Sequence, residues 1–157
     1  MQYRMKTHQL TVEQIEELMQ SEQVGTLATL NEDGTPYAVP VHFVYLNHHV
    51  YIHGLPKGQK ISNIINKSSV CFSVYHMDSL LLDKNGKPCE TNTKYQSVII
   101  NGKADFITDA MEKKKILSKI IDKYTQQLVN MPVPENMING TAVIVINITG
   151  LTGKYYD

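Results

Sequence analysis

The sequence has no tryptophan, and only two of its 157 residues are cysteines. Cys71 lies in an apolar stretch and Cys89 in a polar one, without the spacing of a metal site, so we expect two free thiols. An excess of charge is also missing, because fifteen Lys and Arg residues balance fifteen Asp and Glu residues. This balance excludes the overall field with which a protein holds nucleic acid or an anionic membrane.

Long hydrophobic runs are missing as well. No stretch reaches the roughly 20 apolar residues that cross a bilayer. The first ten residues, MQYRMKTHQL, lack the hydrophobic core of a signal peptide. We therefore expect a cytoplasmic protein that does not enter a membrane. No repeat or linker divides the chain, so residues 1–157 are expected to form one domain.

Several catalytic motifs are absent. The sequence has no GxGxxG after a strand, no P-loop, no HExxH and no serine in a nucleophile elbow. Histidines are frequent between residues 42 and 53, but of these only His49 and His53 are placed to converge from one strand face, and no acid or cysteine joins them. His42 and His48 complete this group. The sequence therefore predicts no metal site.

The stretch from 36 to 66, PYAVPVHFVYLNHHVYIHGLPKGQKISNIIN, organises the chain. Alternating apolar residues from 37 to 45 predict one strand, and residues 49–53 predict a second strand antiparallel to it. Asn47-His48 is the polar turn between them. After Gly54 the period changes, and a short helix is predicted from the spacing of Ile61, Ile64 and Ile65.

Two lysines at this helix point to an anionic ligand. Lys57 and Lys60 fall at or just before the helix N-terminus, where the helix dipole disfavours a cation. The same end offers unpaired N–H groups, which form a seat for phosphate, and Gly54 and Gly58 permit close approach of the backbone. These residues alone leave a second interpretation open, in which both lysines are ordinary solvated surface residues.

The other helices are predicted from capping signals. Thr11 and Gln14 form a capping box that opens a helix ending near Gln20. Its expected buried residues are Val12, Ile15, Leu18 and Met19. Asp109 and Glu112 open another helix, and MPVP at 131–134 ends it. Its expected apolar stripe consists of Leu117, Ile120, Ile121, Tyr124 and Leu128.

Further strands are expected over residues 24–30, 69–75, 95–108 and 141–148, with a hairpin turn at 31–34 and a bend or bulge at Gly102. Residues 76–94 show no sustained period and are interpreted as a long functional loop. Residues 150–157 are interpreted as a tail. About six strands with three helices, joined mostly by tight turns, predict a mainly β fold, an antiparallel β-barrel with peripheral helices.

Three stretches of the chain resemble a known family. VGTLATLNEDGTPYAVPVHFVYLNHHVYIHGLPKGQKISNIINKSSVCFSVY, KYQSVIINGKADFITDAMEKK and the closing residues 148–154 resemble the pyridoxamine 5′-phosphate oxidase-like flavoproteins. Within this family the sequence is most similar to the nitroimidazole-resistance (Nim-type) branch, and the resemblance covers residues 5–154. It implies an FMN-binding split β-barrel that forms a homodimer with two flavins at the subunit interface.

The resemblance also assigns roles to single residues. Lys60 matches the lysine that holds the FMN phosphate, and His53 and Gly54 end a strand beside the cofactor. The strand Val39-Pro40-Val41 would offer backbone groups to the edge of the flavin ring. Ser97 would reach the flavin from the long strand. His53 matches a histidine that faces the flavin, which makes it the candidate catalytic residue, although an ordinary strand-end histidine is the alternative.

The sequence departs from true pyridoxamine phosphate oxidases in three places. Those enzymes carry an Arg and a Lys on the strand matched by residues 39–43, a Ser-Arg pair at Gly58-Gln59, and an arginine in their C-terminal signature. This chain lacks all of these cations, so oxidation of vitamin B6 is not expected. The resemblance instead implies a reductive FMN-dependent oxidoreductase, with nitroimidazole-like nitroaromatics as one substrate class and an external electron donor. The alternatives are a flavin carrier or sensor without turnover, and a relative that binds haem or a deazaflavin.

Overall fold

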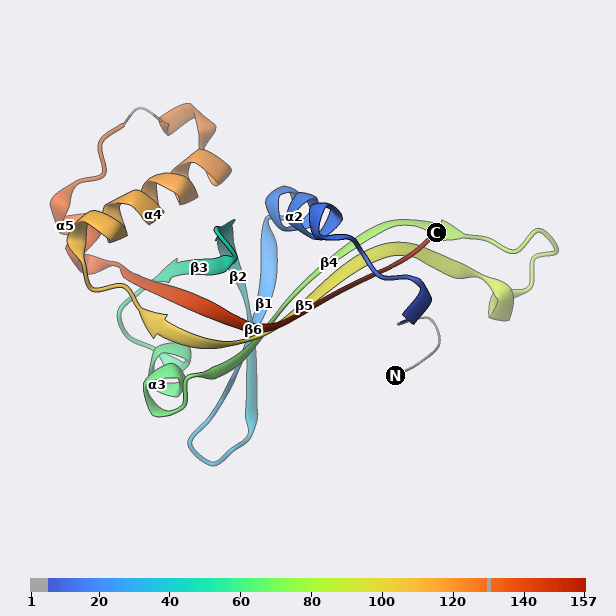
Figure 1. Ribbon diagram of the computed structural model, residues 1–157, viewed down its shortest axis with the longest axis horizontal. Helices are drawn as coiled ribbons and strands as arrows, with labels where there is room; N and C mark the ends of the chain where they lie inside the picture. The colour runs from blue at the N-terminus through green and yellow to red at the C-terminus, as the bar shows by residue number, and fades with distance from the viewer. Residues whose placement is uncertain (1–5, 130) are drawn as a thin grey trace.

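The computed structural model describes residues 6–129 and 131–157. Its centre is a closed antiparallel barrel with the ring order β1-β2-β3-β6-β5-β4 (Figure 1). The strands are β1 (Val24–Leu30), β2 (Pro36–Leu46), β3 (His49–Gly54), β4 (Ser69–Leu81), β5 (Asn92–Phe106) and β6 (Ala142–Tyr156). The structure confirms the mainly β barrel with peripheral helices that the sequence predicts.

The helices lie around this barrel. They are α2 (Val12–Ser21), α3 (Gln59–Asn66), α4 (Ala110–Tyr124) and α5 (Glu135–Gly140), with short 3-10 turns η1 (Pro88–Glu90) and η2 (Gln126–Leu128). The predicted capping box of α2 is present, because the Thr11 N–H donates to Gln14 Oε1 at 2.9 Å and the Gln14 N–H donates to Thr11 Oγ1 at 3.3 Å. Helix α5 was not expected, since its six residues are too few for a helical period to be detected.

Two apolar clusters hold these elements together. The first fills the barrel, where inward residues of the strands meet Leu18 and Met19 of α2 and Ile61 and Ile64 of α3. The second lies outside the barrel, where α4 packs on the outer side of β2, β3 and β6. Helix α4 contributes Ile116, Leu117 and Ile120 to it. The predicted alternation along β2 is confirmed, because its residues 41, 43 and 45 face the first cluster.

Two residues of the expected apolar faces, Val12 and Leu128, and one of the isoleucines that predict α3 are exposed. Val12 occupies the first position of α2, and Leu128 follows the end of α4 at Tyr124, so neither side chain reaches a cluster. Ile65 is 70% exposed because α3 turns Asn63 toward the barrel in its place. A polar residue therefore occupies part of the face that the isoleucine spacing predicts to be apolar.

The long loop predicted for residues 76–94 is wrong. Strands β4 and β5 continue as a two-stranded arm that extends from the barrel (Figure 1), and they still pair at Leu81 and Asn92. Only residues 82–91 connect them. Along β4 the arm's side chains are almost all exposed, so no alternation marks the strand, and the pairing shifts between Met77 and Ser79. A segment without hydrophobic periodicity in the sequence thus forms a regular two-stranded ribbon in the fold.

The tail predicted for residues 150–157 is also wrong, because β6 continues along β5 until Tyr156 pairs with Tyr95. Glycines in this segment interrupt the alternation of apolar and polar side chains from which a strand is predicted. A Cβ on Gly153 would lie 2.8 Å from Ile15 Cγ1, so the glycine allows α2 to pack closely on β6. The irregularity expected at Gly102 is confirmed by a shift of register between Asn101 and Gly102.

Both cysteines are free thiols, as predicted. Among the helices of the described residues, none has the length and apolar character needed to cross a membrane.

Candidate functional site

Helix α3 begins just after the loop that follows β3, and its N-terminus is open. Gly58 is the N-cap residue with φ of 123°, a value that favours glycine. No side chain caps the helix and its first turn holds no acid. The N–H groups of Ile61 and Ser62 donate to Gly58 O at 3.0 and 3.1 Å. The N–H groups before them remain available to an anion.

Lys60 lies against the end of β3. An ideal Cβ built on Gly54 would be 3.3 Å from Lys60 Nζ, so a larger residue at 54 would crowd the ammonium group. Lys60 is half-buried, whereas Lys57 is exposed in the loop. Of the two lysines that the sequence indicates, Lys60 is therefore the one built into the fold beside an open helix N-terminus.

His53 lies next to this seat at the end of β3. Its Nδ1 is buried and has no hydrogen-bond partner among the described residues. Burial lowers the pKa of His53, and the nearby His42 and Lys60 lower it further, so the ring is neutral at pH 7. The His42 ring stacks on Tyr124 with centroids 4.6 Å apart. Val39, Pro40 and Val41 belong to β2, which pairs with β3 from Phe43 and Ile52 onward, so they lie near the same end.

A buried polar network that the sequence did not indicate holds α3 in place. Asn63 is only 1% exposed, and its Nδ2 donates to Thr29 Oγ1 and to Asn31 Oδ1, both at 2.9 Å. Gln59 Nε2 donates to Asn63 Oδ1 at 2.9 Å and to Asn31 Oδ1 at 3.1 Å. These bonds tie the helix to β1 and the following turn. They fix the direction of the N-terminus that carries Lys60.

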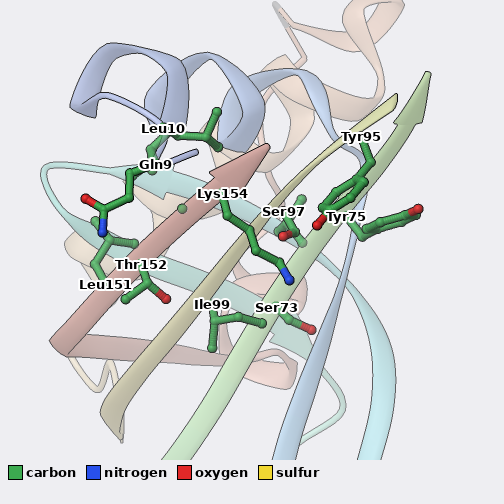
Figure 2. A pocket seen from close by; sticks show the side chains of 13 residues that line it. Gln9, Leu10, Ser73, Tyr75, Tyr95, Ser97, Ile99, Leu151, Thr152 and Lys154 are labelled. Carbon is green, nitrogen blue, oxygen red and sulfur yellow. The ribbon is translucent and has the colours of Figure 1, made fainter. Parts of the chain in front are cut away.

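Ser97 lies in a different cavity, of about 530 Å³, on β5 and β6 (Figure 2). The residue is 8% exposed, and its Oγ has no hydrogen-bond partner among the described residues. Lys154 pairs with Ser97 in the strand register, and Figure 2 shows both on the cavity wall. Tyr75 and Tyr95 stand at its other side with ring centroids 5.7 Å apart. Lys154 and the two tyrosines were not identified from the sequence.

The predicted site residues therefore form two groups rather than one. His53 pairs with Val143 near the start of β6, whereas Ser97 pairs with Lys154 near its end. Eleven residue positions between Val143 and Lys154, at about 3.3 Å each, correspond to a path of roughly 36 Å along the strand. Figure 1 shows α3 and the arm on opposite sides of the barrel. One protomer does not bring Ser97 to the seat at Lys60.

A metal centre is not formed by the described residues, since no three of their His, Cys, Asp and Glu side chains come together.

Comparison with known families identifies the chain. The family model described as pyridoxamine 5′-phosphate oxidase matches residues 11–155. The chain belongs to the pyridoxamine 5′-phosphate oxidase family. The match spans β1 to β6, and so it includes both groups of candidate residues. The comparison with curated protein sequences finds no match.

Solved structures of this architecture are numerous. A candidate 5-nitroimidazole antibiotic resistance protein of Bacteroides thetaiotaomicron is 25% identical, with a TM-score of 0.81 over 92% of this chain and 84% of that one. An FAD and haem binding protein of Mycobacterium smegmatis is 17% identical, with a TM-score of 0.83 over 94% and 72%. An FAD-binding protein of Mesorhizobium loti is 20% identical, with a TM-score of 0.67 over 94% and 96%. These similarities confirm the fold, and the first agrees with the predicted resemblance to the Nim-type branch.

Few cations lie in the segments around the open N-terminus of α3. The β2 segment from 39 to 43 reads VPVHF, and Gly58-Gln59 precede Lys60. Lys60 is thus the one lysine or arginine within α3. The open N-terminus of α3 can accept a small anionic group, with Lys60 as the nearby cation.

Proposed function

We propose that this chain is a cytoplasmic FMN-dependent oxidoreductase of the nitroimidazole-reductase type, with nitroaromatic compounds as substrates and an external electron donor. The observation that carries the proposal is the arrangement of Lys60 and Gly54 at the open N-terminus of α3, beside the unpartnered Nδ1 of His53. Family membership and the similarity to a candidate nitroimidazole resistance protein support it.

The residues present fit a flavin mononucleotide. A phosphate at the start of α3 would accept hydrogen bonds from the open N–H groups and contact Lys60. Its negative charge would offset the unfavourable position of this cation at the positive end of the helix dipole. The described residues hold one such seat, and the sequence has no glycine-rich cradle for a pyrophosphate, which favours FMN over FAD. FAD is named for three of the similar proteins, so identification of the flavin in a heat-released extract is a direct test.

The flavin would supply the transfer of electrons, and the protein would orient and shield it. Backbone groups of Val39, Pro40 and Val41 would bond the edge of the ring. His53 would face the ring as a neutral side chain, because its lowered pKa keeps it uncharged at pH 7. Its buried Nδ1 would gain a hydrogen-bond partner that the described residues do not supply.

The position of Ser97 supports a homodimer. Ser97 lies at the opposite end of β6 from His53, so it reaches the same flavin only if a second protomer contributes it. The outer face of β1, β4 and β5 also carries exposed apolar residues, Val24, Tyr75, Met77 and Ile99, which a second copy would cover. A symmetric dimer would then hold two equal sites. Light scattering that finds a monomer with FMN bound contradicts this arrangement.

The decisive experiment replaces Lys60 by alanine and measures binding of FMN and of riboflavin, which lacks the phosphate. Loss of a charge-assisted hydrogen bond of about 1.5–3 kcal/mol lowers FMN affinity about ten- to a hundredfold. Riboflavin should bind both proteins alike. Lys57→Ala is the matched control, because Lys57 is exposed in the adjoining loop and should leave FMN affinity unchanged.

Equal FMN affinity in Lys60→Ala and the unchanged protein would place the phosphate elsewhere and remove the basis of the proposal. The absorption spectrum of the purified protein distinguishes flavin from haem or a deazaflavin. Reduction of a nitroimidazole by the FMN-loaded protein in the presence of an electron donor distinguishes an enzyme from a flavin carrier or sensor.

A further inference from the structure

Two histidines lie opposite each other on the outer face of the barrel, where the pairing of β2 with β3 ends. Phe43 pairs with Ile52, and both side chains face the barrel core. The next position of this register sets His42 opposite His53, and the alternation along a strand turns both side chains outward. Opposite residues on one face have Cβ atoms about 4.5–5.5 Å apart. Two imidazoles at such positions can reach one metal ion at about 2.0–2.1 Å from each ring nitrogen.

These two histidines differ from the other four of the chain in their hydrogen bonds. His53 Nδ1 is buried and has no partner among the described residues. The His42 ring is stacked on Tyr124 and forms no hydrogen bond within the described part of the chain. The other four histidines already use Nδ1, which contacts Thr7 Oγ1 in His8 at 2.7 Å, the Tyr45 hydroxyl in His48 at 3.2 Å, Asn47 O in His49 at 2.7 Å and Glu22 Oε1 in His76 at 2.7 Å.

The surroundings of the pair determine which ion can bind. Burial lowers the pKa of His53, which keeps its ring in the neutral form that ligates a metal. Over residues 6–129 and 131–157, no third His, Cys, Asp or Glu side chain completes a metal site, so water would fill the remaining positions. Lys60 lies near enough to lower the pKa of His53 further, and its ammonium group repels a cation. Mg²⁺ and Ca²⁺ prefer oxygen ligands, whereas Ni²⁺, Cu²⁺ and Zn²⁺ bind imidazole, so only the second group suits this pair.

We propose that His42 and His53 form a two-histidine site for a divalent transition-metal ion, with Cu²⁺ bound more tightly than Ni²⁺ or Zn²⁺. Each imidazole supplies one nitrogen lone pair, and water completes the coordination. The site goes beyond the proposed function and does not depend on it. Because the proposed function sets His53 against the flavin, a bound ion would withhold this imidazole from the flavin ring.

The test titrates nickel chloride into the purified protein by calorimetry, because Ni²⁺ binds imidazole and, unlike Cu²⁺, does not oxidise the two free thiols. We expect one tightest-bound Ni²⁺ per chain. His42→Gln and His53→Gln should each lower its affinity about tenfold or more, since the second imidazole binds intramolecularly. His49→Gln is the matched control and should leave the affinity unchanged. His49 lies on the same face of β3 as His53, but its Nδ1 is already bonded to Asn47 O.

Two further variants separate this site from adventitious binding to single histidines. The double variant His42→Gln/His53→Gln should bind Ni²⁺ about as weakly as either single variant, because one change already breaks the chelate. Lys60→Ala should tighten Ni²⁺ binding about twofold to fivefold, since a repelling charge is removed. The same variant should lose FMN affinity, so failure here is distinguishable from failure of the phosphate seat.

Melting temperatures show whether the variants fold. His42→Phe, which keeps an aromatic ring against Tyr124, replaces His42→Gln if that variant folds poorly. Absence of Ni²⁺ binding overturns the inference. An affinity that stays unchanged in the folded His42 variant or in His53→Gln shows adventitious binding only and overturns it as well.

Discussion

Replacing Asn63 by leucine should weaken both the fold and the phosphate seat. Leucine has a similar volume, but it removes the bonds that Asn63 donates to Thr29 and Asn31 and the bond that it accepts from Gln59. Asn31 is half-buried and Gln59 is exposed, so water can replace part of what they lose. Thr29 is 2% exposed, and its hydroxyl keeps only the bond that it donates to Tyr37 O at 3.4 Å.

The expected loss of stability follows from the different solvent exposure of the three residues that Asn63 contacts. One buried acceptor on Thr29 is left unpaired, so the free energy of unfolding should fall by about 1–3 kcal/mol. For a chain of this length, each kcal/mol lowers the melting temperature by about 2–4 °C. Asn66→Leu at the exposed end of the same helix is the control for helix propensity. Combining Asn63→Leu with Thr29→Val should recover part of the loss, because no hydroxyl then stays unpaired.

The functional consequence is measured with the two flavins used for Lys60. If the network directs the N-terminus of α3, Asn63→Leu lowers FMN affinity more than riboflavin affinity, since only FMN carries the phosphate. A general loss of structure would lower both affinities equally. Unchanged stability together with unchanged FMN affinity would refute the role assigned to this network.

Two predictions concern the C-terminal end of α4. The Tyr124 hydroxyl accepts a hydrogen bond from the Phe43 N–H at 2.8 Å and lies 2.7 Å from both Phe43 O and Gln23 O, just where β1 begins to pair with β2. Tyr124→Phe should therefore lower the free energy of unfolding by about 1–3 kcal/mol in urea titrations, and an unchanged midpoint would contradict this. Burial lowers the pKa of Lys123 to about 8, against a smaller opposing effect of Glu22. Above pH 8 the unfolded chain therefore binds more protons than the folded protein does. The free energy of unfolding should rise with pH between about 8 and 9.5, by at most about 1.4 kcal/mol per pH unit. The donation of Lys123 Nζ to Met19 O and its position 4.0 Å from the Phe43 ring favour the charged form, which reduces the slope. Lys123→Met should abolish it, and a slope that persists in this variant would show that another group titrates. Above pH 10 the raised pKa values of buried tyrosines act in the opposite direction.

The barrel could be predicted from the sequence because apolar and polar residues alternate along a strand wherever one face of that strand is buried. That signal disappears on the arm, where β4 beyond Val74 exposes nearly every side chain. Only the backbone pairing of the hairpin holds these residues in a strand. Such pairing requires no alternation of apolar and polar residues, so it cannot be detected in the sequence. The glycines at 150 and 153 likewise removed side chains from β6, so the strand was taken for a tail.

Helix α3 was predicted from its isoleucines, yet which face it buries was only partly predictable. Ile61 and Ile64 face the barrel as expected, but Asn63 joins them and Ile65 does not. An asparagine in a core position is stable there only because Thr29, Asn31 and Gln59 satisfy its amide, and these partners lie on other parts of the chain or one turn away. Such a network cannot be predicted from the hydrophobicity of single residues. Lys60, in contrast, was indicated by the resemblance to a family, which does not depend on the network.

The separation of the candidate site into two groups follows from strand order. Because β6 lies between β3 and β5, the end of β3 and the middle of β5 contact different parts of one long strand. Matching motifs assigns both Ser97 and His53 to one cofactor, but a motif does not say which protomer supplies each residue. If both residues contact the same flavin, two protomers must meet with β5 of one against the seat of the other. A twofold axis then makes the second site identical to the first. The predicted stoichiometry is therefore one flavin per chain, and loss of Ser97 in one protomer should impair the site whose Lys60 belongs to its partner.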